Sequence, residues 1–420
     1  MRKLISIVLS ILVLLTLYSY NVYAEEPNIN ESITEFKNMA QSTVDSYLRG
    51  KDITIEKNCI TEENEEYNKM VNMNNEYKEV LNSGVLDNIL ERLLETKTVE
   101  VIKDYESERN ELGLYFSNKP KRPLILDMDL SSDVDDLCAL SIACTLDKMG
   151  VFDLKGVMYS IGTENDMNIS ALNGFLINVQ GLNNVLVGKC ENEYIGDSPY
   201  WNDMGGCGDN RTNVDMVTRQ YRKILANSTE KVDIVTTGYV ENLMYLLKSQ
   251  ADDISEKSGL ELVTEKVGQL YVVGGAYPSG IDNNFIIIPD SMVGADYISV
   301  NWPYPIVYLT SNVGGQLVCG KYLQQLDKDN KYNVTRGLYS FGTGEGRAAW
   351  DPFGVFVCAF GNNKDIGQVD FIRTDITVNP MNGVNSFSDN ENGRHFRVVC
   401  TNENNDYYNR LMDSFLICNL

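Results

Sequence analysis

Beyond Pro123, short apolar runs alternate with stretches in which apolar residues recur at helical spacing. Strands buried in a parallel sheet are typically continuous apolar runs, and helices supply the crossovers between them. The pattern predicts an α/β domain over residues 122–420, with an open, mainly parallel sheet and helices on both faces. Polar and apolar residues alternate in residues 361–397, which favours a terminal hairpin. The expected strands cover residues 124–126, 154–159, 185–187, 232–236, 270–273 and 306–309.

Residues 1–24 have the features of a signal peptide. A charged start is followed by an apolar run from Leu4 to about Leu17 and by Val22-Tyr23-Ala24, a small-residue cleavage site. The apolar run is shorter than the roughly 20 residues that span a bilayer, which favours cleavage over a retained anchor. We therefore expect cleavage after Ala24 and a secreted, extracellular protein without membrane association after signal removal.

Residues 25–121 form a polar and charged segment that precedes the α/β domain. Apolar residues recur in it at helical spacing, as at Ile33 and Phe36 and again at Leu86, Ile89 and Leu90. The spacing predicts a helical N-terminal extension. None of its residues suggests chemistry, so packing on the main domain or a partner surface is the expected role.

The formal net charge of −23 limits the partners of this chain. Such a charge repels phosphate backbones and argues against nucleic-acid binding, whereas it suits a bound cation. The nine cysteines lack CxxC pairs and zinc spacing. Those inside apolar segments are expected to be small buried side chains, while a disulfide between Cys190 and Cys207 stays open. The single histidine, His395, excludes a histidine cluster for zinc.

Five aspartates crowd the loop between the first expected strand and a following helix, in the sequence DMDLSSDVDD of residues 127–136. Like charges at this density raise one another's pKa unless a cation neutralises them. Carboxylate oxygens without histidine or cysteine suit Ca²⁺ or Mg²⁺. Helix capping would account for one or two of these residues and leave the others unexplained.

This motif, followed by Leu-Cys-Ala-Leu, resembles the N-terminal signature of the inosine-uridine preferring nucleoside hydrolase family in its longer DxDxxxDxDD variant. Further segments resemble family landmarks in the same order, and the resemblance runs from about Pro123 to the C-terminus. These segments are VDIVTTGYVENL at 232–243, VVGG at 272–275 followed by DNNF at 282–285, PIVYLTSNVGGQLVCG at 305–320 and RAAWDP at 347–352.

The resemblance implies a calcium-dependent N-ribohydrolase that acts on a small-molecule riboside. It implies that Ca²⁺ is held by Asp129, Asp136, the main-chain carbonyl of Thr237 and Asp351. It also implies that Asp129 takes a proton from the metal-bound water that attacks the anomeric carbon. The residues implied to contact the sugar are Asp135, at the ribose diol, with Asp282, Asn284 and Asn165.

Three departures from the family pattern concern the substrate. Trp350 stands where several family members have a histidine, so imidazole is not available there to protonate the leaving base. The indole could instead stack on the base, or it could be a buried aromatic under the metal loop. The segment between Gly275 and Asp282 lacks a further asparagine, and Ile288-Pro289-Asp290 has one acid fewer.

Two other functions compete with the hydrolase. A catalytically weak surface protein could keep the calcium site and the sugar pocket for binding alone. A phosphatase or sugar transferase built on the DxD would need a phosphate-binding motif, which the sequence does not contain. The sequence leaves homo-oligomerisation open, as it leaves the identity of the base.

Overall fold

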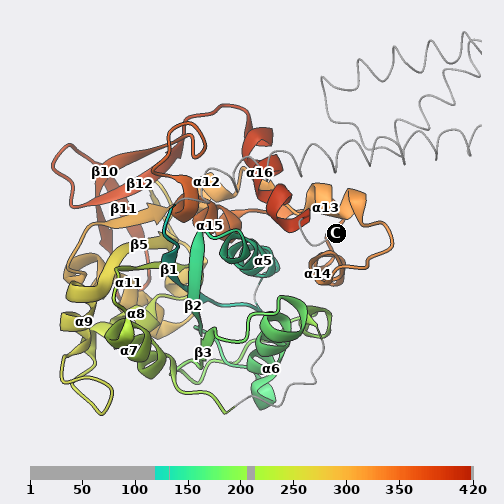
Figure 1. The fold of residues 1–420 in the computed structure, drawn as a ribbon. Coiled ribbons are helices and arrows are strands. Elements are labelled where there is room, and N and C mark those ends of the chain that lie inside the picture. The colour runs from blue at the N-terminus through green and yellow to red at the C-terminus, as the bar shows by residue number, and fades with distance from the viewer. Residues whose placement is uncertain (1–118, 132, 206–212, 418–420) are drawn as a thin grey trace, which may run out of the picture. The chain divides into compact units, whose positions relative to one another are not determined.

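One mixed sheet of ten strands runs through the part of the chain that the structure, a computed structural model, describes: residues 119–131, 133–205 and 213–417. The parallel strands are β1 (Arg122–Met128), β2 (Phe152–Tyr159), β3 (Leu186–Gly188), β4 (Val232–Thr236), β5 (Val267–Val273), β7 (Ile306–Leu309) and β12 (His395–Cys400). Three strands pair antiparallel: β10 (Val369–Val378), β11 (Asn385–Asp389) and β6 (Ser279–Gly280). The order across the sheet is β3-β2-β1-β4-β5-β7-β12-β10-β11-β6 (Figure 1).

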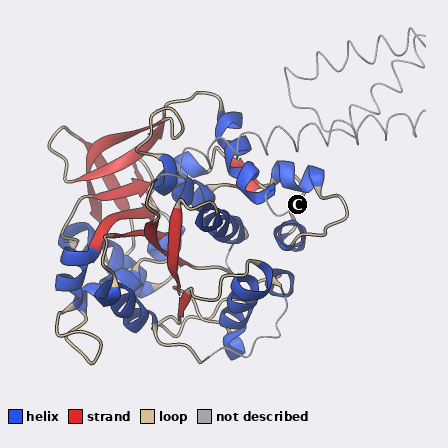
Figure 2. Cartoon of the chain, in the orientation of Figure 1, coloured by secondary structure: helices blue, strands red, loops and turns tan. Residues whose placement is uncertain are grey.

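Helices cover both faces of this sheet (Figure 2). Leu124 and Leu126 of β1 belong to one apolar core and Ile125 to the other, as the alternation of side chains along a strand requires. The first core includes α5 (Asp135–Lys148), α14 (Asn333–Phe341), α15 (Trp350–Phe360) and α16 (Asn405–Ile417). The second includes α7 (Val217–Asn227), α8 (Glu241–Lys248), α9 (Gly259–Lys266) and α11 (Pro289–Asn301). The predicted fold class is confirmed.

The expected strands are present, and two of them, 232–236 and 306–309, have the predicted bounds. β10 and β11 form the terminal hairpin. The sequence pattern did not reveal that β12 then returns between β10 and β7, where it extends the parallel part of the sheet. Shorter elements lie in the connections: α6 (Met167–Gly174), α10 (Asn283–Ile286), α12 (Ser311–Gly314), α13 (Lys321–Leu326), and a small pair of strands, β8 (Val318–Cys319) and β9 (Arg347–Ala348).

Several sequence-based predictions fall outside the described residues. The signal peptide and nearly all of the helical extension, residues 1–118, are among them, and so is Cys207. Cys190 is buried and carries a free thiol. Within the described ranges, no helix combines the length and the apolar composition that crossing a membrane requires.

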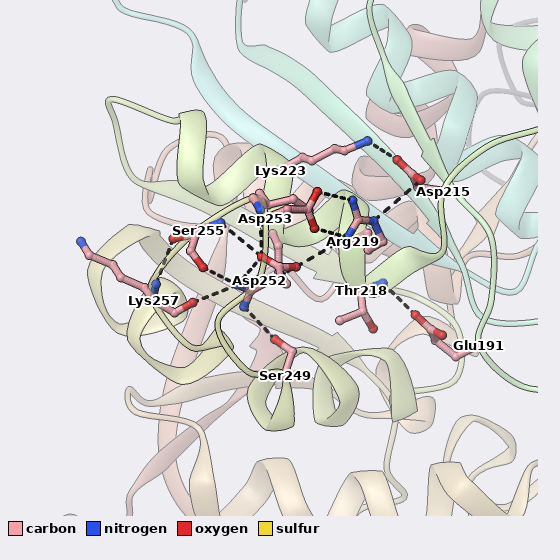
Figure 3. Close-up of polar contacts among 12 residues, drawn as sticks. Glu191, Asp215, Thr218, Arg219, Lys223, Ser249, Asp252, Asp253, Ser255 and Lys257 are labelled. Carbon is pink, nitrogen blue, oxygen red and sulfur yellow. Dashed lines mark hydrogen bonds and ion pairs between the residues drawn. The ribbon is translucent and has the colours of Figure 1, made fainter.

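The loop that connects α8 to α9 carries Ser249, Asp252 and Ser255 (Figure 3), and the guanidinium of Arg222 on α7 holds it. The Arg222 side chain is only 1% exposed, and its Nε and Nη2 donate to the two carboxylate oxygens of Asp252 at 2.9 and 2.8 Å. Nη1 donates to Ser249 Oγ, and Nη2 also reaches the main-chain carbonyls of Ser255 and Lys257. One buried cation therefore satisfies four acceptor groups from a single loop.

His395 lies at the start of β12 with both ring nitrogens engaged by the main chain. Its Nδ1 accepts from the backbone N–H of Ile306 at 3.1 Å, and its Nε2 lies 2.9 Å from the carbonyl oxygen of Ser299, to which it donates. The ring is buried, and burial is the largest cause that lowers its pKa below the ordinary 6.5. The only histidine of the chain is therefore a neutral structural group.

Protonation of His395 should destabilise the fold as the solution becomes acidic. Because the pKa is lower in the folded than in the unfolded chain, the unfolded chain takes up the proton first. The stability that the neutral ring contributes is complete above pH 6.5 and is lost as the pH falls from 6.5 through the folded pKa. NMR of ¹⁵N-histidine-labelled protein gives a single ring to follow. A titration midpoint at or above that of the unfolded chain would contradict the expectation.

Candidate metal and sugar site

The acidic loop joins β1 to α5 at the carboxyl end of β1. β4 is the parallel neighbour of β1, with Asp127 in register with Thr236, so the turn that begins at Thr237 lies beside the acidic loop. Asp351 is the second residue of α15, which packs against α5. Three segments distant in sequence thus meet at one edge of the sheet, where ligands bind in open α/β folds.

Three of the expected carboxyl groups converge. Asp135, Asp136 and Asp351 each offer an oxygen within 4.8 Å of the others, and all three residues are buried. The backbone N–H of Asp351 donates to Asp135 Oδ2 at 3.2 Å, and a hydrogen bond joins the carboxyl groups of Asp136 and Asp351. Burial, followed by the neighbouring carboxylates, raises the pKa of each well above its usual range. All three groups can be ionised together in this space only if a cation neutralises them.

Asp129 lies beside this cluster. It is 4% exposed, and its negative charge contributes to the raised pKa values of Asp135, Asp136 and Asp351. The hydroxyl of Tyr239 donates to its carboxylate. The position of Asp129 also depends on Gly238, because a Cβ atom there would lie 2.4 Å from the Asp129 backbone nitrogen. Only glycine lets the turn after β4 approach the acidic loop this closely.

The carbonyl of Thr237 faces the side chain of Asn284. Nδ2 of Asn284 donates to the Thr237 carbonyl oxygen at 2.7 Å and to the Val273 carbonyl at 3.0 Å. Thr237 itself donates from its backbone N–H to the Asp127 carbonyl, and its hydroxyl lies 3.5 Å from Asp136 Oδ1. A carbonyl oxygen has two lone pairs, so the Thr237 oxygen can accept from Asn284 and keep one pair for a metal.

Asp282 is buried next to Asn284 at the start of α10. Its Oδ1 accepts from the Asn284 backbone N–H at 3.0 Å, and the backbone N–H of Gly275 and the Ser311 hydroxyl also donate to it. Burial raises the pKa of Asp282 to about 6 although these hydrogen bonds lower it. The loops after β5 and β7 therefore hold this carboxyl in place beside Asn284.

Trp350 is half-buried and fixed by contacts on several sides. Its Nε1 donates to the Ser311 carbonyl at 2.9 Å, and the Arg347 guanidinium lies 5.3 Å from the ring centroid. A Cβ atom at Gly314 would come within 2.5 Å of Trp350 Cα, so the backbone of α12 packs closely against it. The indole is not a fully buried core residue, and base stacking by it stays a prediction.

Asn165 is placed differently from the other predicted sugar-contacting residues. It is exposed in a short turn at Glu164–Asp166, where its φ of 55° is left-handed. Asn168, three residues later, is buried, but its amide is engaged by Thr163 and by the Ile161 carbonyl. A sugar contact by Asn165 stays a prediction.

Sequence reasoning gave no role to several residues that support the site. Asp127 is fully buried and accepts from the Tyr221 hydroxyl at 2.6 Å and from Asn242 Nδ2 at 3.0 Å. Burial raises the pKa of Asp127 to about 7. Only Asp127, as the first aspartate of the DxD, could have been noticed from the local sequence. Its partners Tyr221 and Asn242 come from α7 and α8.

The carboxyl groups that converge are those of Asp135, Asp136 and Asp351, and Asp129 of the predicted ligand set is not among them. The chemistry of the predicted set suits a calcium ion. The set would comprise the carboxylates of Asp129, Asp136 and Asp351 with the carbonyl of Thr237, all hard oxygen ligands without imidazole or thiolate. Arg347 acts on Asp135 as a positive charge, but its guanidinium is already paired with Asp133. Nitrogen and sulfur ligands of a zinc site are absent from this set.

No family model and no curated protein sequence matches the chain. Several solved structures resemble the fold of this chain. The type III effector protein XopQ complexed with adenosine diphosphate ribose is 14% identical, with 76% of this chain and 99% of that chain covered and a TM-score of 0.55. The effector protein XOO4466 has the same identity and coverage, with a TM-score of 0.54. An inosine-guanosine nucleoside hydrolase is 15% identical over 70% of this chain and 98% of its own, with a TM-score of 0.51. The chain has a nucleoside hydrolase-like fold.

Proposed function

We propose that the protein is a secreted, calcium-dependent N-ribohydrolase that cleaves the N-glycosidic bond of a ribonucleoside or related riboside to give ribose and a free base. The observation that carries the proposal is the convergence of the Asp135, Asp136 and Asp351 carboxyl groups beside Asp129 and Thr237. The fold supports it, since one solved structure with this fold is a nucleoside hydrolase and another holds adenosine diphosphate ribose. An extracellular setting would supply calcium.

Asp129, Asp136, Asp351 and the carbonyl of Thr237 would hold the calcium ion. When bound, the ion would lower the pKa of a water molecule and orient the sugar hydroxyls. The carboxylate of Asp129 accepts the proton of the attacking water at one Oδ atom. The Tyr239 hydroxyl, which donates to the same carboxylate, orients it for this transfer.

The remaining polar side chains bind the sugar in this proposal. Asp135 accepts from the ribose diol, and the backbone N–H of Asp351 fixes the direction of its carboxylate. Asp282 and Asn284 contact the rest of the ring. The negative charge of Asp282 and the amide dipole of Asn284 stabilise the positive charge that develops on the sugar as the N-glycosidic bond breaks.

The leaving base receives no proton from histidine. His395 is buried with both ring nitrogens bound to the main chain, so it cannot act as a general acid. Trp350, directly before Asp351, is the side chain proposed to stack on the base. Stacking makes the base a better leaving group, and the departing base takes its proton from solvent water.

Release of reducing sugar from a panel of purine and pyrimidine ribosides, with calcium and with EDTA, tests the proposal. We expect hydrolysis that EDTA abolishes and excess calcium restores. Calcium should also raise the melting temperature, because a ligand at 100 times its Kd stabilises a fold by about 2.7 kcal/mol. Calcium-dependent stabilisation without hydrolysis of any riboside would replace the enzyme by a calcium- and sugar-binding protein. An unchanged melting temperature would contradict the metal site.

A further inference from the structure

Asp133 belongs to the acidic loop, yet its carboxylate pairs with an arginine instead of joining the cluster. Nε of Arg347 donates to Asp133 Oδ1 at 2.9 Å and Oδ2 at 3.1 Å, and Nη2 donates to Oδ2 at 2.6 Å. This fork fixes the plane of the carboxylate as well as its position. The converging oxygens belong to Asp135, Asp136 and Asp351, and Asp133 is not among them.

Aromatic side chains hold the pair from the outside. The Arg347 guanidinium lies between two rings, 5.3 Å from the centroid of Trp350 and 5.5 Å from that of Phe341. Phe341 packs edge-on against Tyr200, with ring centroids 6.4 Å apart. The Tyr200 hydroxyl in turn donates to the Asp133 main-chain carbonyl at 2.5 Å. Arg347 therefore fixes the direction of this carboxylate, while Tyr200, Phe341 and Trp350 hold the Asp133 backbone and the guanidinium in place.

Asp133 is close enough to the acidic cluster for the direction of its carboxylate to affect the cluster. It lies two residues before Asp135, and its charge acts on both Asp135 and Asp136. Without Arg347, the negative charge of Asp133 beside the cluster would be uncompensated. Its carboxylate would also be an additional oxygen ligand, able to occupy the coordination position that the water or a sugar hydroxyl needs.

We propose that Arg347 is a positioning residue that withholds the Asp133 carboxylate from the calcium site and so keeps a coordination position open for the substrate. This inference rests on the proposed calcium site, and it concerns which oxygen atoms can reach the ion there. Arg347 itself touches neither sugar nor metal in this scheme. Its effect depends on the presence of the Asp133 carboxylate, which provides the test.

The experiment compares Arg347→Met, Asp133→Asn and the double variant with the full-length wild type. Methionine keeps an apolar chain between Trp350 and Phe341 but cannot pair with Asp133. We expect Arg347→Met to lose roughly 10- to 100-fold in kcat/KM, as outer partners of metal sites do. Its calcium Kd, measured by titration calorimetry, should be unchanged or lower, because the released carboxylate attracts the ion. Asp133→Asn in the same chain should restore activity and return the Kd to that of the wild type.

Arg397→Met is the matched control, because Arg397 makes a chemically equivalent set of contacts on β12. Its Nε donates to both oxygens of Asp389 at 2.9 and 3.0 Å, and its guanidinium lies 4.0 Å from the Tyr277 ring centroid. Arg397→Met should lose about as much thermal stability as Arg347→Met, while its calcium Kd should equal that of the wild type. Adding Asp133→Asn to Arg397→Met should not restore the lost thermal stability.

A simple loop clamp would behave differently. If Arg347→Met weakens calcium binding and Asp133→Asn does not restore it, or if neither activity nor Kd changes, the inference is overturned. Wild-type protein that binds calcium but hydrolyses no riboside would refute the hydrolase, while the calcium titrations of the four proteins would still decide the role of Arg347. Failure of the wild type to bind calcium would overturn both.

Discussion

Replacing Asp129 by asparagine should reduce riboside hydrolysis by more than about 10²-fold, the lower end of the range for general acid–base catalysis. Asparagine cannot accept the proton of the attacking water, and it also weakens one ligand of the proposed calcium site. The two losses can be separated by measuring kcat at saturating calcium. Excess calcium compensates a weakened ligand but not a missing base, so activity should stay low. Recovery of wild-type kcat in excess calcium would contradict the role of Asp129 as base.

Asp153→Asn is a suitable control for Asp129→Asn. Asp153 lies at the start of β2, at the opposite end of the strands from the acidic loop, and its half-exposed carboxylate pairs with Lys155. This substitution removes one negative charge from the chain, as Asp129→Asn does. Its kcat and calcium Kd should equal those of the wild type, which would show that the effect at Asp129 is local.

Arg222→Met should lower the free energy of unfolding by about 3 kcal/mol, near the lower end expected when one partner of a buried ion pair is removed. The substitution removes the donor of the Ser255 and Lys257 carbonyls and the arginine that pairs with Asp252. Asp252 Oδ1 keeps the backbone N–H groups of Ile254 and Ser255. Asp252 keeps some access to water, since 25% of its side chain is exposed, and this limits the loss. Urea denaturation of the full chain, followed by circular dichroism, measures the change.

The neighbouring Arg219 supplies the control. It lies on the same helix and also forks onto an aspartate, Asp253, but the two side chains are 39% and 72% exposed (Figure 3). Water replaces most of such a contact, so Arg219→Met should lower the free energy of unfolding much less than Arg222→Met does. Equal losses for the two variants would mean that burial of Arg222 is not what makes its interactions important.

The parallel core of the fold was predictable because its strands are buried on both faces. β7 is a continuous apolar run, and β4 is apolar apart from Asp233 and Thr236; both were located with their observed bounds. The acidic loop was predictable for a similar reason, since all five aspartates lie within ten consecutive residues. Asp351 and Thr237 came from local motifs that resemble one family. Thr237 lies beside the acidic loop because β4 is the parallel neighbour of β1, and the carboxyl ends of both strands share one edge of the sheet. Asp351 reaches the loop from α15, which packs against α5.

The parts that sequence reasoning missed depend on contacts between distant segments. Asp133 and Arg347 are 214 positions apart, and neither carries a local signal that the two side chains pair. The place of β12 was missed because period-two alternation identifies a strand and not its neighbours. The two consecutive left-handed residues Asn165 and Asp166, which turn the chain there, were also not foreseen.

The unequal burial of the three tryptophans makes the molecule its own optical probe. Trp201 and Trp302 lie in the two apolar cores, at most 2% exposed, so a neutral collisional quencher such as acrylamide cannot reach them. Trp350 is half-buried and directly precedes Asp351. Quenchable fluorescence therefore arises almost entirely from the indole next to the carboxylate cluster. A ligand that settles there shields the indole, and occupancy can be followed by light without any turnover of substrate.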